Sequence, residues 1–348
     1  MKAARLYGAH DVRLEDVAVP DLEPGTALVR VRAVGLCGSD LHYYRDGRIG
    51  TSLADQPLVL GHEFAGEIAA LAPGMQGKAG AALSPGAAVA VDPAIACGTC
   101  EPCQEGHPNL CPAVRFCGTP PTDGALQEYV AWPAHLLYPL PRGTSFTTGA
   151  LLEPLGVLIH AVDLAKIRLA DTVAVLGAGP IGLLAIKLAK LSGAVRVFAT
   201  EVVPERMAAA RAFGADAVAD PRETDPARWL RERTGGRGVD VAIECAGAPE
   251  TPSQAVDAVR PGGTVVLVGI PGDDRIDLPA APARRKGVTI KLCRRMKHTY
   301  PRALALVEAG LVDLSGLATH RFALAQAPQA FRLLDHGEGG VLKAMIEP

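Results

Sequence analysis

The stretch Thr172-Val173-Ala174-Val175-Leu176-Gly177-Ala178-Gly179-Pro180-Ile181-Gly182 decides the fold of this chain. Its first five residues form an apolar run typical of a buried strand, and apolar residues continue with helical spacing to residue 191. A glycine-rich turn between such a strand and a helix suits phosphate groups, because the helix N-terminus offers free N–H groups and a positive dipole. The sequence therefore predicts a dinucleotide site at this turn.

Each glycine of the turn has an expected role. Gly177 permits the tight turn, Gly179 leaves room for the pyrophosphate, and Gly182 lets the helix pack closely on the strand. Glu201, after the next predicted strand, should accept hydrogen bonds from the adenosine ribose and repel a 2′-phosphate, which favours NAD over NADP. We expect Arg206 over the adenine face, with attraction of a 2′-phosphate as the alternative. The other predicted cofactor contacts are Pro180, Ile181, Val268, Ile270 and Arg294.

Strand and helix patterns alternate around this turn. The sequence predicts strands at 172–176, 195–200, 239–243 and 264–268, with helices at 181–191 and 204–213. Such alternation is typical of a parallel, doubly wound sheet of the Rossmann type. The predicted NAD-binding domain covers residues 156–294.

The segments before and after the predicted NAD-binding domain have a different sequence pattern. Short apolar runs at 27–34, 67–71 and 87–91, separated by turn residues, predict strands of a β-rich domain, and the Ala/Gly/Pro-rich run 79–90 predicts a surface loop. A helical stretch at 301–309, the segment 319–322 and the final segment 341–346 are expected to return to that domain. The prediction is thus an α/β protein with a catalytic domain at 1–155, completed by 295–348.

The length and net charge of the chain limit its possible domain organisation and partners. A chain of 348 residues exceeds one ordinary hydrophobic core, so two domains are expected. The formal net charge is −2 and no basic run stands out, which argues against nucleic-acid and membrane-surface partners and favours a small-molecule substrate. No apolar stretch of signal-peptide length opens the chain, so a cytoplasmic protein is expected.

Four of the eight cysteines lie close together. Cys97, Cys100, Cys103 and Cys111 have the spacing C-x2-C-x2-C-x7-C, within a predicted lobe at about 93–114. Four thiolates around tetrahedral zinc leave no open position, so this zinc site should be structural. An iron–sulfur cluster also accepts four cysteines, but the compact lobe and the neighbouring nucleotide fold favour zinc.

A second metal site is expected from dispersed residues. Cys37, His62 and Glu63 each stand beside a glycine or another ligand, and Glu153 lies near the predicted domain boundary. Taken singly, each is more often a structural residue. Taken together, they resemble a catalytic zinc site that keeps a position open for water or substrate.

The whole chain resembles the zinc-containing medium-chain dehydrogenase/reductase family. The segments that carry the resemblance are Gly35-Leu36-Cys37-Gly38-Ser39-Asp40, Gly61-His62-Glu63-Phe64-Ala65-Gly66-Glu67, the cysteine lobe, Leu152-Glu153-Pro154-Leu155 and the turn 177–182. Within the family, Gly47-Arg48-Ile49-Gly50, Phe116-Cys117-Gly118-Thr119-Pro120-Pro121, Thr299-Tyr300-Pro301 and Thr319-His320-Arg321-Phe322 are similar to the sorbitol/xylitol (polyol) dehydrogenase branch. This resemblance implies a GroES-like catalytic domain with an inserted Rossmann domain.

The resemblance also implies an activity. Two zinc ions per chain are expected, one structural and one catalytic, with NAD accepting hydride from a secondary hydroxyl of a polyol to give a ketose. Cys37 and His62 are implied as direct zinc ligands, and Glu63 and Glu153 as acidic members of the site, of which either could contact zinc. Ser39 and His42 resemble the family's relay for the hydroxyl proton.

The implied substrate pocket carries the residues that distinguish related enzymes. Tyr43, Phe116 and Glu153 should line it, and Arg295 should hold a further hydroxyl. The run Arg294-Arg295-Met296-Lys297-His298 has more cations than the branch usually shows, so a carboxylate or phosphate at the remote end of the substrate stays open. The alternatives are an L-threonine or butanediol dehydrogenase, or a catalytically silent NAD- and zinc-binding protein. The branch also implies a homo-oligomer, namely a tetramer.

Overall fold

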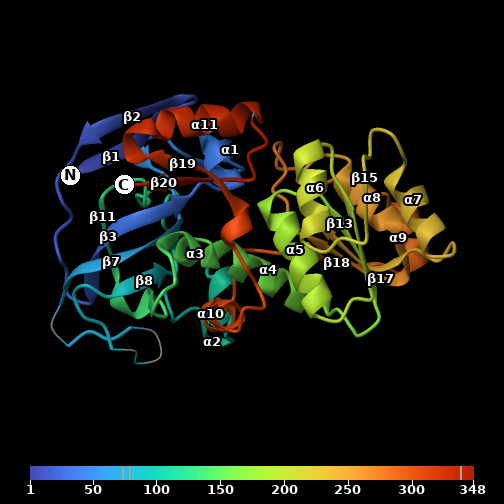
Figure 1. Ribbon diagram of the computed structural model, residues 1–348, viewed down its shortest axis with the longest axis horizontal. Coiled ribbons are helices and arrows are strands. Elements are labelled where there is room, and N and C mark those ends of the chain that lie inside the picture. Colours follow the sequence, from blue (N-terminus) through green and yellow to red (C-terminus); the bar gives the residue numbers. More distant parts are fainter. Residues whose placement is uncertain (73, 78–79, 81, 338) are drawn as a thin grey trace. The chain divides into compact units, whose positions relative to one another are not determined.

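The computed structural model describes residues 1–348 except 73, 78–79, 81 and 338. The chain divides into two compact units (Figure 1). Unit 1 comprises Met1–Pro154 and Tyr300–Pro348, and unit 2 comprises Leu155–Thr299. The second segment of unit 1 begins later than the expected residue 295, because Met296 and Thr299 pack against Gly156, where an added Cβ would lie 2.7 Å from Thr299 Oγ1.

Unit 1 is built on a mixed sheet. Among the described residues it has seven strands, in the order β12-β8-β7-β3-β20-β19, with β11 also paired to β3. Their bounds are β3 Thr26–Gly35, β7 Glu63–Leu71, β8 Ala88–Val91, β11 Tyr129–Pro133, β12 Leu137–Pro139, β19 Ala318–Ala323 and β20 Lys343–Glu347. The C-terminal strand β20 therefore lies between β3 and β19, so the end of the chain completes a sheet that its beginning starts. Residues 79 and 81 of the expected loop 79–90 lie outside the described residues.

Shorter strands surround this sheet. A further sheet has the order β2-β1-β6, from Asp11–Asp16, Lys2–Gly8 and Leu58–Val59. Two short ribbons pair β4 (Arg48–Ile49) with β5 (Ser52–Leu53), and β9 (Ala94–Ile95) with β10 (Arg115–Phe116). The second ribbon brackets the cysteine lobe in the sequence.

Unit 1 also contains helices, and all of those described except α2 (Glu101–Gln104) bury side chains. They are α1 Gly38–Asp46, α2 Glu101–Gln104, α3 Phe146–Ala150, α10 Tyr300–Glu308 and α11 Ala327–His336, with one-turn 3-10 helices at Pro108–Leu110, Ala134–Leu136, Ser315–Leu317 and Leu324–Gln326. Helix α11 buries Ala327, Ala330 and Phe331, whose spacing marks one face of a helix. The Phe331 ring stacks on Tyr44 of α1 with centroids 5.0 Å apart, which joins the two helices.

Unit 2 is a parallel sheet with helices, as predicted. The sheet has six strands among the described residues, in the order β15-β14-β13-β16-β17-β18. The strands are β13 Thr172–Leu176, β14 Arg196–Thr200, β15 Ala217–Ala219, β16 Val239–Glu244, β17 Val259–Leu267 and β18 Thr289–Leu292. The helices are α4 Leu152–Ala165, which begins in unit 1, α5 Pro180–Leu191, α6 Pro204–Ala212, α7 Pro226–Arg233, α8 Thr251–Ala258 and α9 Ala280–Lys286. Strand order reverses at β13 and β16, and ligands of such sheets bind at the carboxyl ends beside that reversal.

The expected strand at 264–268 begins earlier. Strand β17 starts at Val259, and its register with β16 shifts between the pairs Val239↔Val259 and Val241↔Thr264. Gly262 and Gly263 lie in this irregular stretch, where glycines accommodate a bulge. In the sequence these two glycines indicate a turn, so the strand was predicted to begin only after them, at residue 264.

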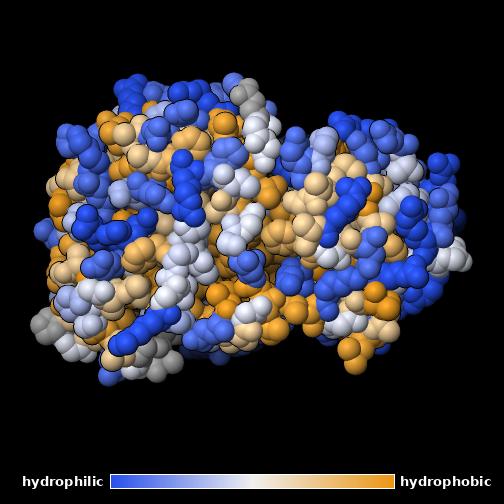
Figure 2. All heavy atoms as spheres, in the orientation of Figure 1, coloured by the Kyte–Doolittle hydropathy of each residue, from blue (hydrophilic) through white to orange (hydrophobic). Residues whose placement is uncertain are grey.

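The surface and the longest apolar helix are consistent with a folded core. Figure 2 shows hydrophilic residues over the visible face around α7 and α9. The helical stretch Phe146–Ala165 has the length and apolar composition of a membrane span, but 67% of its apolar 18-residue window is buried inside the protein. It therefore packs as an interior helix here.

Asp240 ties together three strands of unit 2. Its carboxylate accepts hydrogen bonds from Arg237, from Arg260 Nε at 2.7 Å, and from the backbone N–H and hydroxyl of Thr172 at 2.9 Å. Asp240 is 7% exposed. Burial alone would raise the pKa of this carboxyl, but the hydrogen bonds from Arg237 and Arg260 hold it well below its usual range.

Asp240→Asn should lower the free energy of unfolding of unit 2 by about 2–3 kcal/mol at pH 7, because hydrogen bonds to a charged group contribute about 1.5–3 kcal/mol each. The carboxyl has a lower pKa in the folded than in the unfolded chain, where it is about 3.9. Its contribution is therefore fully present above about pH 5 and is lost as the pH falls through the folded-state pKa. Urea titration of Trp229 fluorescence in a Trp132→Phe background measures this unit, since these are the chain's two tryptophans.

The matched control is Glu232→Gln. Glu232 pairs with Arg228 at 3.8 Å on the exposed face of α7, so its loss should change the free energy of unfolding by less than about 0.5 kcal/mol. An equal effect of both substitutions, or an Asp240→Asn effect that vanishes between pH 7 and pH 5, would contradict the assignment.

Candidate active site

The four lobe cysteines converge. Their sulfur atoms all lie within 4.8 Å of one another, with Cys111 buried and Cys97 exposed. The backbone N–H groups of Cys97 and Cys100 donate to Cys111 Sγ and Cys97 Sγ at 3.4 Å, and backbone N–H groups of Thr99 and Cys100 lower the pKa of the Cys97 thiol to about 6. Sulfur ligands of one zinc ion, each about 2.3 Å from it, lie at this separation. The lobe therefore has the donor set of a closed tetrahedral metal site.

Cys37 and His62 are held by a residue that the sequence analysis did not select. Asp40, 1% exposed, accepts the backbone N–H of Cys37 at 2.8 Å and that of Gly61 at 3.1 Å. Its Oδ1 also lies 3.5 Å from His62 Nδ1. Carboxylates that face one ring nitrogen of a histidine orient the other nitrogen toward a metal. The spacing Cys37-x-x-Asp40 at the start of α1 is a capping arrangement, and this was the local signal for Asp40.

Glu63 completes a second group of converging donors. Ligand atoms of Cys37, His62 and Glu63 lie within 4.8 Å of one another, so of the described residues this set and the lobe are the two that could hold a metal ion. Lys343 donates to Glu63 Oε1 at 2.7 Å, and both side chains are almost fully buried. Lys343 stands 280 positions from Glu63 in the sequence and was not predicted.

The remaining acidic candidate, Glu153, lies outside that 4.8 Å group. It stands in the first turn of α4 and is 4% exposed. Burial raises the pKa of the Glu153 carboxyl to about 7, with His62 lowering it and Glu63 raising it. Burial lowers the pKa of His62, but the charge of Asp40 and hydrogen bonds with Asp40 and Cys37 together raise it well above its usual value. Glu153 therefore belongs to the electrostatic surroundings of His62 and Glu63.

The predicted relay and pocket residues of unit 1 lie on nearby elements. Ser39 and His42 are three residues apart on α1, and His42 Nδ1 lies 4.0 Å from Asp46 Oδ2 at the end of the same helix. The Phe116 ring lies 5.2 Å from the His62 ring, which puts an apolar surface beside the metal-ligand group. Tyr43 is 2% exposed, and its hydroxyl bonds with Ser52 Oγ at 2.8 Å.

The glycine turn of unit 2 has the geometry expected for a dinucleotide. Gly177 has φ +88°, and a Cβ there would lie 2.8 Å from the Ala246 nitrogen; a Cβ at Gly182 would lie 1.9 Å from the Gly177 oxygen. At Gly179 an added Cβ would meet nothing nearer than Arg206, at 4.0 Å. The first two glycines are therefore required by packing, whereas space is left at Gly179, where α5 begins with Pro180 and Ile181.

Glu201 stands at the carboxyl end of β14 and reaches back to this turn. Its carboxylate accepts the backbone N–H of Ala178 at 2.8 Å, of Val202 at 2.7 Å and of Val203 at 3.0 Å. Val268 and Ile270 follow the carboxyl end of β17, on the same edge of the parallel sheet. Arg294 and Arg295 follow β18, and Arg295 adopts a left-handed backbone with φ +52°. Each predicted cofactor residue of unit 2 thus follows a strand end or begins α5 or α6.

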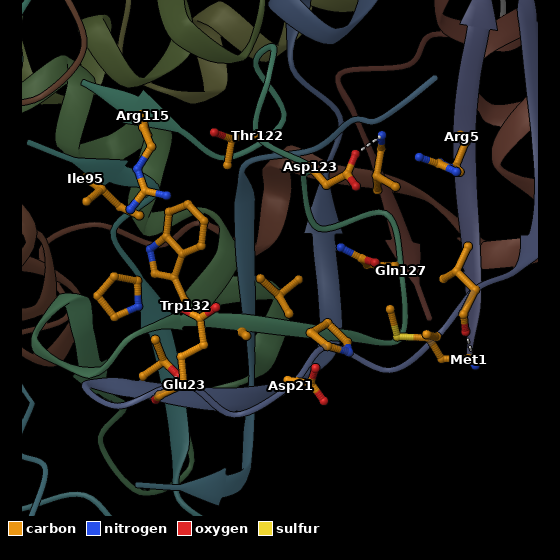
Figure 3. Close-up of a pocket in the computed structure, with 18 residues that line it drawn as sticks. Met1, Arg5, Asp21, Glu23, Ile95, Arg115, Thr122, Asp123, Gln127 and Trp132 are labelled. Atoms are coloured by element: carbon orange, nitrogen blue, oxygen red, sulfur yellow. Dashed lines mark hydrogen bonds between the residues drawn. The ribbon is translucent and has the colours of Figure 1, made fainter. Parts of the chain in front are cut away.

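A pocket of about 520 Å³ in unit 1 lies elsewhere (Figure 3). Its lining includes Arg5, Asp123 and Trp132, but, of the residues that the structure describes, none of the predicted catalytic, metal or cofactor residues. Two of its polar side chains bond to backbone: Arg5 donates to the Pro57 oxygen at 3.2 Å. Asp123 accepts the Val59 N–H at 2.8 Å (Figure 3). The pocket contributes no chemistry to the site.

Two stretches of the chain match known families. Residues 23–142 match the family described as alcohol dehydrogenase GroES-like domain, and residues 180–309 match the family described as zinc-binding dehydrogenase. The donor set of sulfur, nitrogen and carboxylate oxygen in unit 1 is one that zinc accepts.

Relatives extend over the whole chain. Sorbitol dehydrogenase from Bacillus subtilis (strain 168) is 38% identical over 348 residues, covering 100% of this chain and 97% of that protein. The solved structure of 2R,3R-butanediol dehydrogenase from Bacillus subtilis has a TM-score of 0.87 at 33% identity, covering 100% of this chain and 99% of that one. A zinc-binding dehydrogenase structure from Sinorhizobium meliloti 1021, bound to NADP, has a TM-score of 0.89 at 31% identity, with coverage of 100% and 99%. The chain therefore belongs to the zinc-containing medium-chain dehydrogenase/reductase family, and it is a zinc-dependent dehydrogenase that uses a nicotinamide cofactor.

Proposed function

We propose that this enzyme oxidises a secondary hydroxyl of a sorbitol- or xylitol-like polyol to a ketone, with NAD as the hydride acceptor. The observation that carries the proposal is the convergence of Cys37, His62 and Glu63, three donors that leave a position for substrate, beside the buried Glu153. The 38% identity to a sorbitol dehydrogenase supports the substrate class.

The residues of unit 1 prepare the reacting centre. Asp40 fixes His62 and the backbone of Cys37, and Phe116 contributes an apolar wall beside His62. Cys37, His62 and Glu63 would hold a zinc ion, which would supply a Lewis acid for the substrate oxygen, and a bound nicotinamide would supply the hydride acceptor. Loss of a hydride from carbon and a proton from oxygen converts the alcohol to the ketone.

The proton needs a path to solvent. Ser39 and His42 lie on one face of α1, since residues three apart are neighbours on a helix. His42 is 21% exposed at its side chain and lies close to Asp46, which is 52% exposed. We assign the relay to Ser39 and His42, with Asp46 next to its outer end.

The resemblance to the polyol dehydrogenase branch assigns Glu153 and Arg295 to hydroxyl groups of the substrate. Glu153 is buried in unit 1, and its carboxyl oxygens can accept hydrogen bonds from such hydroxyls. The runner-up is 2,3-butanediol or L-threonine as substrate, favoured by the likeness to a butanediol dehydrogenase structure. A catalytically silent protein is the alternative of a different class.

Three further properties belong to the proposal. Two zinc ions per chain are supported by the two donor groups, one closed and one open. Five of the eight cysteines are assigned to zinc and none of the eight lies in a disulfide, which supports a reducing compartment such as the cytoplasm. A homotetramer is proposed from the resemblance to the polyol dehydrogenase branch.

The direct test is NADH production from sorbitol, xylitol, galactitol, ribitol, L-threonine and 2,3-butanediol. The best polyol should exceed butanediol in kcat/KM by about tenfold or more, because buried polar groups of the pocket lose partners with the smaller diol. A zinc chelator should abolish the rate. Preference for butanediol or L-threonine would favour the runner-up, and no turnover by a protein with two bound zinc ions would favour the silent alternative.

Metal content separates the two zinc sites. Cys37→Ala should remove one zinc and reduce kcat by about 10³-fold or more, because several kcal/mol of Lewis-acid stabilisation are lost, while NADH binding persists. Cys100→Ala should remove the other zinc and mainly lower the melting temperature. Zinc per chain by mass spectrometry and NADH fluorescence titration check both, and full turnover in Cys37→Ala would overturn the catalytic assignment.

Cofactor choice is expected to depend on Glu201. Glu201→Gln removes the charge that repels a 2′-phosphate and keeps one of the two acceptor oxygens, since Oε2 accepts the Ala178 N–H and Oε1 accepts the Val202 N–H. The ratio of kcat/KM with NAD to that with NADP should fall by at least about tenfold, equivalent to about 1.4 kcal/mol. Glu205→Gln, on the exposed start of α6, is the control. Preference of the unmodified enzyme for NADP would refute the assignment.

A further inference from the structure

We propose that Gly35 and Lys343 are positioning residues that fix the Glu63 carboxylate so that a single oxygen, Oε2, is available to the catalytic metal. The inference rests on the proposed function, since it takes Cys37, His62 and Glu63 as the metal ligands. It concerns two residues that make no contact with substrate in that function.

The three residues come from adjacent strands of unit 1. Gly35 ends β3, Glu63 begins β7 and Lys343 begins β20. Gly35 pairs directly with Glu63 on one side and with Met345 on the other. Strand β3, which ends just before Cys37, thus pairs with β7 from the first part of the chain and with β20 from its end.

Lys343 engages one oxygen of the carboxylate. Its ammonium donates to Glu63 Oε1 at 2.7 Å and to the Leu36 carbonyl at 3.0 Å. The side chains of Lys343 and Glu63 are 4% and 0% exposed. A buried ion pair costs desolvation energy that its mutual attraction often only balances, so its presence here requires a reason other than stability.

Gly35 leaves room for the other oxygen. A Cβ at Gly35 would lie 2.2 Å from Glu63 Oε2 and 3.3 Å from both Cβ and Cδ of Glu63. The backbone of Gly35 is not in the left-handed region, so a side chain is excluded by the carboxylate and not by φ. Even the methyl group of alanine would therefore displace this carboxylate.

The two oxygens of Glu63 are consequently inequivalent. Oε1 is bound by Lys343, whereas Oε2 is buried and accepts no hydrogen bond within the described structure. A buried carboxylate oxygen without a donor is costly unless a cation or water satisfies it. Oε2 is thus the oxygen that a metal at the Cys37 and His62 group would take, and the ammonium keeps Oε1 from binding as a second ligand atom.

Zinc affinity measured by chelator competition tests this arrangement without relying on turnover. Lys343→Met should weaken zinc binding at the Cys37 site by 10–100-fold, the usual loss when a partner of a metal ligand is removed. Lys343→Arg, which keeps the charge, should recover most of that loss. Gly35→Ala should weaken the same site by at least tenfold, while the four-cysteine lobe keeps its zinc in all three variants.

Phe331→Leu is the matched control. It perturbs the core of unit 1 between α11 and α1 without touching the metal ligands, so zinc affinity should stay within threefold of the unmodified enzyme. Should Lys343→Met fail to fold, Gly35→Ala decides, because it removes no charge.

The outcomes distinguish a failure of the positioning role from a failure of the proposed function. Weaker zinc binding in Gly35→Ala and Lys343→Met, but not in Phe331→Leu, supports the positioning role. Unchanged affinity in both, or an equal loss in the control, overturns it and leaves the proposed function intact. An unmodified protein with zinc only at the lobe overturns both.

Discussion

A single buried carboxylate organises the site of unit 1. Asp40 takes up the N–H groups of Cys37 and Gly61 and faces Nδ1 of His62, so one side chain joins the start of α1 to the segment that enters β7. These bonds are made within the protein itself, so they restrain the backbone of Cys37 and the ring of His62. Preformed donors reduce the conformational entropy that a metal site must otherwise lose on binding.

The two groups of metal donors in this chain have different roles, one structural and one catalytic. The lobe takes its four sulfurs from one short segment, Cys97 to Cys111, whose helices α2 and Pro108–Leu110 are too short to form a core of their own. A closed metal shell stabilises such a segment but offers nothing to a substrate. The open group takes its donors from the residue before α1, the residue before β7 and the first residue of β7, which the pairing of β3 with β7 brings together. The feature that most readily identifies the family is thus separate from the feature that does its chemistry.

Local patterns in the sequence were sufficient to predict much of this structure. The parallel sheet, the turn at Gly177 and the cysteine lobe were predicted because strand periodicity, glycine placement and ligand spacing are encoded within short segments. The role of Asp40 was missed although a capping pattern indicated it, and the early start of β17 was hidden by glycines that form an irregular register instead of a turn. Lys343 had no local signal at all, because its partner is brought to it by the pairing of β20 with β3. Long-range register is set by tertiary packing, which a single sequence does not reveal.

The interrupted course of unit 1 along the chain also fixes an order of events during synthesis. Unit 2 is continuous from Leu155 to Thr299, so a ribosome delivers all of it before β19 and β20 exist. Until the last strands emerge, Val34 and Gly35 at the end of β3 lack the strand that pairs with them, although β11 already pairs with the start of β3, and the Glu63 carboxylate has no ammonium beside it. The nascent chain can therefore complete its nucleotide-binding half first, whereas its catalytic half stays dependent on residues translated last. A ribosome that stalls or terminates before Lys343 would release a polypeptide with an exposed sheet edge, which is a substrate for chaperones and proteases.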